Sequence, residues 1–238
     1  MDDLKIINGR VVTFQGGPIK GKYMDSPLVL ENTNIIIDDG YITAIDSDRP
    51  AKKTIDAKGK LVIPGFIDSH THLVFAGSRE DEFEKRLKGI SYQEIAGEGG
   101  GILSTVRATR NADRNTLIQL AKKRLDFALS WGTTTIEIKS GYGLSTEDEL
   151  KMLEVIGELK KTSCQTIVST FLGAHEFPPD RGRNEYISII LNEMLPEIAR
   201  RKLARFIDVF CEDGVYTKEE SKKILLKGRD FGLLPKIH

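Results

Sequence analysis

From Leu61 onward, the sequence alternates between short β-prone runs and longer segments with apolar residues at helical spacing. Such repeated βα units predict a parallel sheet, because parallel strands need a long crossover connection between them. The expected strands are residues 61–67, 133–138, 165–172, 206–211 and 234–238, and the expected helices are 116–130, 146–161, 185–201 and 217–228. Capping-box spacing pairs Thr146 with Glu149 and Thr217 with Glu220 at two helix starts. The alternation is compatible with a doubly wound sheet or with a (β/α) barrel.

The first sixty residues follow a different pattern, with short strands and no long helical segment between them. The expected strands are residues 5–7, 11–14, 34–37 and 41–45. The sequence Asp38-Asp39-Gly40 lies between the last two strands and predicts a hairpin turn. We therefore expect two domains, a small β unit over residues 1–60 and the main α/β domain over residues 61–238.

The bulk composition excludes several function classes. Lysine plus arginine and aspartate plus glutamate number 35 each, so no basic surface is expected for nucleic acid or anionic lipid. The first residues lack the basic and apolar regions of a secretory signal, and no run approaches the ~18 apolar residues of a membrane span. Cys164 and Cys211 form neither a CxxC pair nor a disulfide framework. We expect a soluble protein of the cytoplasm.

Two of the four histidines lie two residues apart at the end of the first expected parallel strand. Residues i and i+2 of a strand point to the same side, so His70 and His72 project together. Two neutral imidazoles placed in this way form half of a metal site that could activate water. The alternative is a pair of imidazoles hydrogen-bonded in a polar core. Asp68 lies on the same face and could orient one ring or cap the strand end.

Polar candidates also follow the other expected strands. They are residues 139–142, His175, Glu212 and His238. Both parallel architectures place active sites at the carboxyl ends of their strands. Histidines at successive strand ends favour the barrel, because its strand ends converge on one point.

At these residues the sequence resembles a known family. Pro64 to His72 is similar to the first-strand signature of the amidohydrolase superfamily. Four further segments resemble the imidazolonepropionase family within it, the ring-opening hydrolases of histidine degradation: residues 74–80, 98–102, 138–144 and 171–175. The resemblance extends over essentially the whole chain. It implies a metal-dependent (β/α)8 barrel beside a small β-sandwich built from both chain ends, with residues 1–60 as its N-terminal contribution.

The resemblance also implies a mononuclear site filled by zinc or iron. It matches His70 and His72 with the first-strand pair and His238 with the fifth-strand histidine. The family's eighth-strand aspartate, and its acid–base glutamate three residues after the fifth-strand histidine, have no counterpart within residues 1–238. About five of eight strands are expected here, so the resemblance predicts the N-terminal part of an enzyme, inactive by itself.

The same resemblance assigns Arg79, Tyr142, His175 and Tyr92 to substrate binding, and it predicts that His175 donates a hydrogen bond to the scissile carbonyl. The implied substrate is 4-imidazolone-5-propanoate, whose carboxylate suits a guanidinium fork. The alternatives are a surface salt bridge between Arg79 and the two acids that follow it, and a simple turn position for Tyr142 between glycines.

The implied reaction is hydrolysis of the cyclic amide bond to give N-formimidoyl-L-glutamate. Two other functions compete: a deaminase or related hydrolase of a nitrogen heterocycle, and a non-catalytic assembly subunit. A second metal bridged by Glu212, or less readily by a carbamate on Lys139, is a further alternative. A homodimer is the assembly considered, and no nucleic acid or membrane partner is expected.

Overall fold

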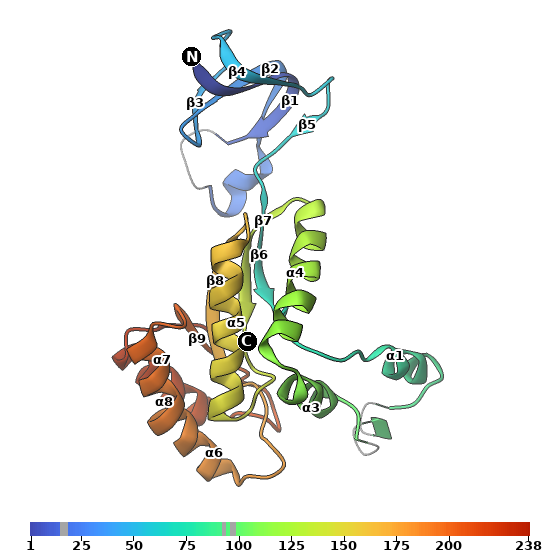
Figure 1. The fold of residues 1–238 in the computed structure, drawn as a ribbon, viewed down its shortest axis with the longest axis vertical. Coiled ribbons are helices and arrows are strands. Elements are labelled where there is room, and N and C mark those ends of the chain that lie inside the picture. The colour runs from blue at the N-terminus through green and yellow to red at the C-terminus, as the bar shows by residue number, and fades with distance from the viewer. Residues whose placement is uncertain (15–18, 92–93, 96–98) are drawn as a thin grey trace. The chain divides into compact units, whose positions relative to one another are not determined.

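The computed structural model describes residues 1–14, 19–91, 94–95 and 99–238 (Figure 1). The chain separates at Gly65 into two compact units, Met1–Gly65 and Phe66–His238. Residues 61–65 therefore belong to the first unit. No helix among the described residues is long and apolar enough to cross a membrane.

The first unit is a five-stranded sheet with the order β3-β2-β1-β4, in which β5 also pairs with β1. Its elements are β1 (Asp2–Thr13), the 3-10 helix η1 (Gly21–Asp25), β2 (Leu28–Asp38), β3 (Tyr41–Ile45), β4 (Ala51–Asp56) and β5 (Leu61–Val62). The predicted hairpin turn between β2 and β3 is confirmed, with positive φ angles of 49° at Asp39 and 76° at Gly40. The two strands expected at the start of the chain form one bulged strand, whose register against β2 shifts between Ile6 and Gly9, where Asn8 has a φ of 56°.

The prediction of one buried strand over residues 61–67 is wrong. Leu61 and Val62 pair with β1 in the first unit, whereas β6 (Phe66–Thr71) starts the sheet of the second unit. Pro64 lacks an amide hydrogen and cannot continue the ladder, so the apolar run divides between two sheets. Phe66 is 54% exposed and Ile67 is 72% exposed. Their strand has only one neighbour among the described residues, β7, which leaves them uncovered.

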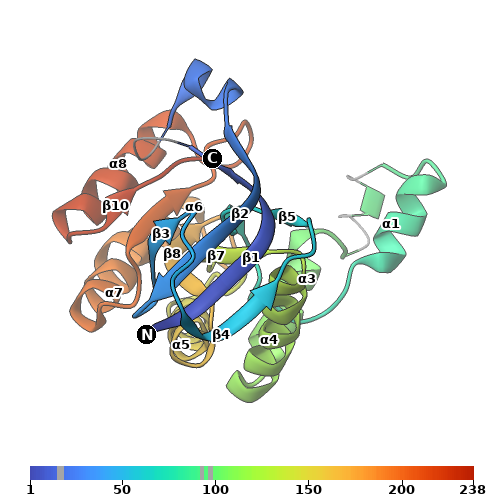
Figure 2. The ribbon, with the colours of Figure 1, turned by 90° about the horizontal axis from the view of Figure 1, so that it is seen from above.

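The second unit is a five-stranded parallel sheet with the order β10-β9-β8-β7-β6 (Figure 2). The strands that follow β6 are β7 (Thr133–Lys139), β8 (Thr166–Ala174), β9 (Phe206–Val209) and β10 (Leu234–Pro235). The helices are α1 (Glu80–Leu87), α3 (Ile102–Asn111), α4 (Arg114–Ser130), α5 (Thr146–Thr162), α6 (Arg183–Ile189), the π-helix η2 (Ile190–Met194), α7 (Leu195–Arg201) and α8 (Lys218–Asp230). The strands lie in chain order without a reversal. This singly wound order is that of a barrel and not of a doubly wound sheet.

Helices cover one face of this sheet in the order of the strands. In Figure 2, α4, α5, α7 and α8 follow one another along that face, and α4 packs on β7, α5 on β8 and α8 on β9. The core between them consists of aliphatic side chains at helical spacing and their strand partners: Leu117, Ala121, Leu125, Met152, Leu153, Ile156, Ile136, Ile167 and Phe171. The helical periodicity in the sequence therefore marks the faces that are buried.

The helix boundaries test the predicted caps. The capping box at the start of α8 is confirmed, with Thr217 and Glu220 bonded reciprocally. The box predicted at Thr146 is wrong, because Ser145 caps α5 by accepting from the Asp148 amide at 3.1 Å. The expected helix over residues 185–201 runs through α6, η2 and α7, and the π turn lies where Pro196 removes a hydrogen-bond donor. Helices α1 and α3 were not predicted from the sequence.

Candidate functional site

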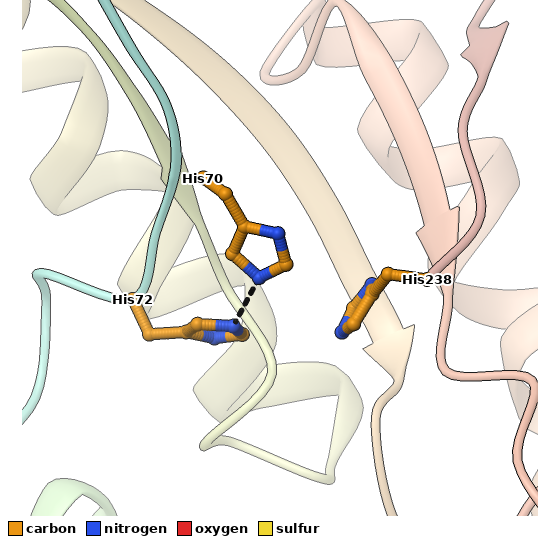
Figure 3. A group of neighbouring side chains, drawn as sticks. All are labelled: His70, His72 and His238. Carbon is orange, nitrogen blue, oxygen red and sulfur yellow. Dashed lines mark hydrogen bonds between the residues drawn. The ribbon is translucent and has the colours of Figure 1, made fainter.

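Three histidines come together at the carboxyl ends of strands at the two edges of the parallel sheet. His70 ends β6, His72 follows it, and His238 follows β10. One ring nitrogen from each lies within 4.8 Å of the others, and Nε2 of His70 is 3.3 Å from Nε2 of His72. Figure 3 shows the three rings around a common space. Within the described part of the chain, these three histidines are the group of histidine, cysteine or acidic residues that could hold a metal ion.

Strand pairing explains how these rings are positioned. The hydroxyl of Thr71 donates to the Glu137 carbonyl at 2.6 Å, so its neighbours in the alternating strand, His70 and His72, point to the other side. The amide of His238 donates to the Val209 carbonyl at 3.1 Å, and the amide of Cys211 donates to the His238 carbonyl at 2.7 Å. His238 therefore extends the β9–β10 pairing.

Asp68 acts on the backbone. Its Oδ1 accepts from the His70 amide at 3.2 Å, and no bond from its carboxylate to an imidazole is found among the described residues. Of the two roles considered for this residue, the geometry favours capping of the strand end.

Burial keeps the first two rings neutral. It lowers the pKa of His72 to about 3, with the nearby His175 as the second cause. Burial, followed by the charge of Lys139, also lowers the pKa of His70. Nδ1 of His72 is buried and has no hydrogen-bond partner among the described residues. Neutral imidazoles with free lone pairs are the form that binds a metal ion, so the donor set fits one.

A network of buried charges lies behind His238. Nδ1 of His238 is 2.9 Å from Oδ2 of Asp208, and the Lys139 ammonium donates to the same oxygen at 2.6 Å. Lys139 also donates to Glu137 at 3.0 Å. Burial would raise the pKa of Asp208, but the hydrogen bonds from His238 and Lys139 outweigh it and lower the pKa to about 2.

Glu137 and Asp208 were not predicted from the sequence as residues of the site. The available signal was an acidic residue inside an otherwise apolar strand, as in Ile136-Glu137-Ile138 and Ile207-Asp208-Val209. The ammonium of Lys139 is already engaged by two carboxylates, which disfavours a carbamate there. Glu212 is exposed and bonds the amide of Asp213 at 3.0 Å, outside the histidine group. The structure therefore supports neither a carbamate on Lys139 nor the Glu212 carboxylate as the ligand of a second metal.

A hollow of about 510 Å³ is lined by Arg79 and Tyr142. Arg79 pairs with Glu82 at 2.7 Å and keeps 39% of its side chain exposed. Its salt bridge is therefore made within α1, with neither of the two acids that follow it directly. Arg124 lies at the same hollow, with its guanidinium 3.6 Å from the centre of the Phe75 ring. Tyr92, the other tyrosine expected to bind substrate, lies outside the described residues.

Tyr142 connects this hollow to the histidines. Its ring centre is 5.5 Å from that of His72 and 5.3 Å from that of His175, and the rings of His72 and His175 stack at 4.7 Å. Burial raises the pKa of Tyr142, which keeps its hydroxyl protonated. Two of the residues expected to contact substrate, Tyr142 and His175, thus lie next to His72, which is expected to hold the metal.

The hydrogen bond of His175 defines its chemistry. Nδ1 lies 2.9 Å from the Gly141 carbonyl. A carbonyl only accepts, so Nδ1 carries the hydrogen and Nε2 of the neutral ring has a lone pair. Burial lowers the pKa of His175 to about 4, so the ring is neutral at pH 7. Nε2 is then an acceptor, whereas the expected donation to a carbonyl would require a second proton.

Glu149 holds the loop that carries Tyr142, and it too was missed. Its fully buried carboxylate accepts from the amides of Gly141 at 3.0 Å, Gly143 at 2.8 Å and Leu144 at 3.0 Å. Gly141 has a φ of +113°, and a Cβ there would lie 2.9 Å from Nδ1 of His175. Only glycine fits this backbone without moving the histidine.

Comparison with known proteins agrees with this geometry. Residues 53–154 match the model of the amidohydrolase family. The imidazolonepropionase of Clostridium tetani is 48% identical over 240 residues, which cover 96% of this chain and 57% of that protein. The chain thus spans little more than half the length of this curated relative.

Solved structures resemble the chain at low identity. The 5-methylcytosine deaminase from Klebsiella pneumoniae, liganded with 5-fluorocytosine, matches with a TM-score of 0.65 and 16% identity over 98% of this chain and 50% of that chain. An uncharacterized metal-dependent hydrolase from Pyrococcus furiosus matches with a TM-score of 0.60 and 14% identity, covering 99% of this chain and 66% of that chain. These likenesses concern the fold alone. They agree with the predicted α/β architecture, which is a (β/α)8 barrel of which this chain contains only part of the strands.

Proposed function

We propose that this chain, which matches the amidohydrolase family model over residues 53–154, serves the metal-dependent hydrolysis of 4-imidazolone-5-propanoate to N-formimidoyl-L-glutamate. The cyclic amide C–N bond is the one broken. The observation that carries the proposal is the convergence of three histidines within 4.8 Å, next to Tyr142, which also lines a hollow with Arg79 and Arg124. The name and 48% identity of the Clostridium tetani relative support this substrate. The proposal includes a cytoplasmic location, since histidine degradation is a pathway of the cytoplasm.

His70, His72 and His238 are the proposed ligands of one zinc or iron ion. Their imidazole nitrogens suit both metals, and the low pKa values of the first two keep their lone pairs free near neutral pH. A metal bound there would lower the pKa of its water toward about 7 and thereby supply hydroxide.

The remaining residues of the site bind and orient the substrate. Arg79 offers a planar fork to the propanoate carboxylate once it releases Glu82. Tyr142 presents its ring and a protonated hydroxyl between the hollow and the histidines. His175, held by the Gly141 carbonyl, offers Nε2 as an acceptor to a ring N–H of the substrate or to water.

Metal content tests the first part of this proposal. Protein supplied with zinc or iron is expected to hold about one equivalent and to lose it in His70→Ala. Hydrolysis is measured as formation of N-formimidoyl-L-glutamate, and residues 1–238 by themselves are expected to bind metal without forming this product. Protein that binds neither metal would contradict the hydrolase function and would favour a non-catalytic role.

Ligand binding tests the substrate class. The probes are 3-(imidazol-4-yl)propanoate, which carries the carboxylate, and 4-methylimidazole, which does not. Arg79→Ala should weaken binding of the first probe about tenfold or more and leave the second unchanged, because a charged hydrogen bond is lost. Arg86→Ala, in the same helix, is the control. Equal losses for both probes would favour a neutral heterocycle as substrate.

A further inference from the structure

A buried ion network connects β7 and β9 behind the histidine group. Lys139 is 2% exposed and lies between Glu137, which is 3% exposed, and Asp208, which is 1% exposed. Asp208 is the only member of this set that contacts a proposed ligand among the described residues, since its Oδ2 meets Nδ1 of His238 at 2.9 Å. Its Oδ1 accepts from the Val209 amide at 2.8 Å. Both oxygens of this carboxylate are therefore fixed.

We propose that Asp208, held in place by Lys139, is a positioning residue that fixes the tautomer and the ring orientation of His238. The proposal rests on the metal site proposed above. A carboxylate only accepts, so Nδ1 of His238 must carry the hydrogen and Nε2 is left with the lone pair that a metal requires. Histidines that bind metals commonly donate their other N–H to a carboxylate in this way, which orients the ring and makes the ligand more basic.

Lys139 has a defined part in this arrangement. A carboxylate with only His238 as partner could rotate, but the 2.6 Å bond from Lys139 and the Val209 amide fix both of its oxygens. A buried ion pair is a poor source of stability, because the cost of desolvation offsets most of the attraction. Its position next to a proposed ligand therefore favours a role in geometry.

The other carboxylate of the network provides a matched control. Glu137 accepts from the Thr170 hydroxyl and lies 2.9 Å from the Lys236 ammonium. Neither its carboxylate nor the Thr170 hydroxyl contacts a proposed ligand among the described residues. Thr170→Val removes one hydrogen bond from this network at nearly constant volume. It therefore disturbs the same buried region without touching Asp208.

The experiment measures metal affinity and the histidine tautomer separately. Co²⁺ affinity is determined by competition with a chromophoric chelator for the unaltered protein, Asp208→Asn and Thr170→Val. We expect Asp208→Asn to bind Co²⁺ ~10–100-fold more weakly, and Thr170→Val to bind it like the unaltered protein. Equal affinity in all three proteins would overturn the proposal. So would a loss in Thr170→Val as large as in Asp208→Asn, because the network would then act through stability alone.

The tautomer is measured by long-range ¹H–¹⁵N NMR on the metal-free protein. This measurement on the unaltered protein tests the proposal even if a variant fails to fold. The unaltered protein should show His238 protonated at Nδ1, and Asp208→Asn a mixture of tautomers. A hydrogen on Nε2 of His238 in the unaltered protein would overturn the inference. Failure of the unaltered protein to bind Co²⁺ or Zn²⁺ would instead refute the proposed function, and the tautomer would still decide the inference.

Discussion

Two buried carboxylates hold the two halves of the candidate site, and they are satisfied in opposite ways. Glu149 accepts hydrogen bonds from three backbone amides of the loop that carries Tyr142, and among the described residues no charged group bonds to its carboxylate. Asp208 meets the ammonium of Lys139 and a ring nitrogen of His238. The first carboxylate fixes a backbone conformation, whereas the second fixes a side chain.

Their ionisation differs accordingly. Burial raises the pKa of Glu149, and hydrogen bonds from the Ser140 side chain and the loop amides offset this only in part. The pKa of Asp208 falls to about 2, because bonds from His238 and Lys139 outweigh burial. Loss of Glu149 should therefore act mainly on the stability of the loop, and loss of Asp208 on the histidine group. The predictions below test that division, starting with the largest effect.

Glu149→Ala should destabilise the protein most, by about 3–5 kcal/mol, because three buried amides lose their only acceptor. The free energy of unfolding is measured by urea titration. Glu147→Ala, at an exposed position in the first turn of the same helix, is the control and should change stability by less than about 0.5 kcal/mol. A loss of less than about 1 kcal/mol in Glu149→Ala would show that water can replace the carboxylate.

Gly141→Ala should cost about 2–3 kcal/mol, since a Cβ would lie 2.9 Å from both the Leu172 carbonyl and Nδ1 of His175, at a φ of +113°. It should also displace His175, which is followed by the chemical shifts of its ring. Gly157→Ala is the matched control, because no atom lies within 4 Å of a Cβ there. In the middle of α5 that change should stabilise the protein by about 0.5–1 kcal/mol. Equal effects at both positions would refute the steric argument.

Much of the fold could be predicted because its signals are local. Apolar periodicity marked the buried faces of α4 and α5, and β-branched runs marked β7 and β8. The ligand candidates His70 and His72 were also visible, because strand alternation alone places them together. That His238 joins them depends on the convergence of strand ends that a barrel provides, and its role as a ligand came only from the resemblance to a family.

The other features of the site could not be predicted, because they depend on the partner that each polar side chain contacts in the folded protein. Glu149 has the spacing of a capping residue, yet its carboxylate turns inward to the amides of a preceding loop, and Ser145 takes the cap. Asp208 and Glu137 lie in apolar strands, where sequence alone does not reveal that Lys139 will neutralise them. The boundary between β5 and β6 was missed because both sheets use one continuous apolar run.

The cap of α5 gives a smaller test of the same distinction. Ser145→Ala should destabilise the protein by about 1 kcal/mol, because the Asp148 amide loses the hydroxyl that it bonds at 3.1 Å. Thr146→Ala should change stability by less than about 0.5 kcal/mol, since this residue is already inside the helix. The two free energies of unfolding are compared at pH 7. A larger loss of stability in Thr146→Ala than in Ser145→Ala would support the capping box predicted from the sequence. Glu149 would then bond the helix start and not the loop amides.

The smallest expected effect concerns Glu220, a partly exposed counterpart of Asp208. A hydrogen bond from Arg183 is the main cause that lowers the pKa of Glu220 to about 2. Because the folded pKa lies below the ordinary value of 4.5, the stabilisation is complete above pH 4.5 and is lost as the pH falls toward 2. Arg183 is 41% exposed, so solvent screening limits this contribution to about 1 kcal/mol. Arg183→Leu should therefore reduce the loss of stability between pH 5 and pH 3 by a fraction of that amount, measured as the shift in the urea midpoint. An unchanged pH dependence would mean that buried carboxylates such as Asp208 alone govern the acid sensitivity of this fold.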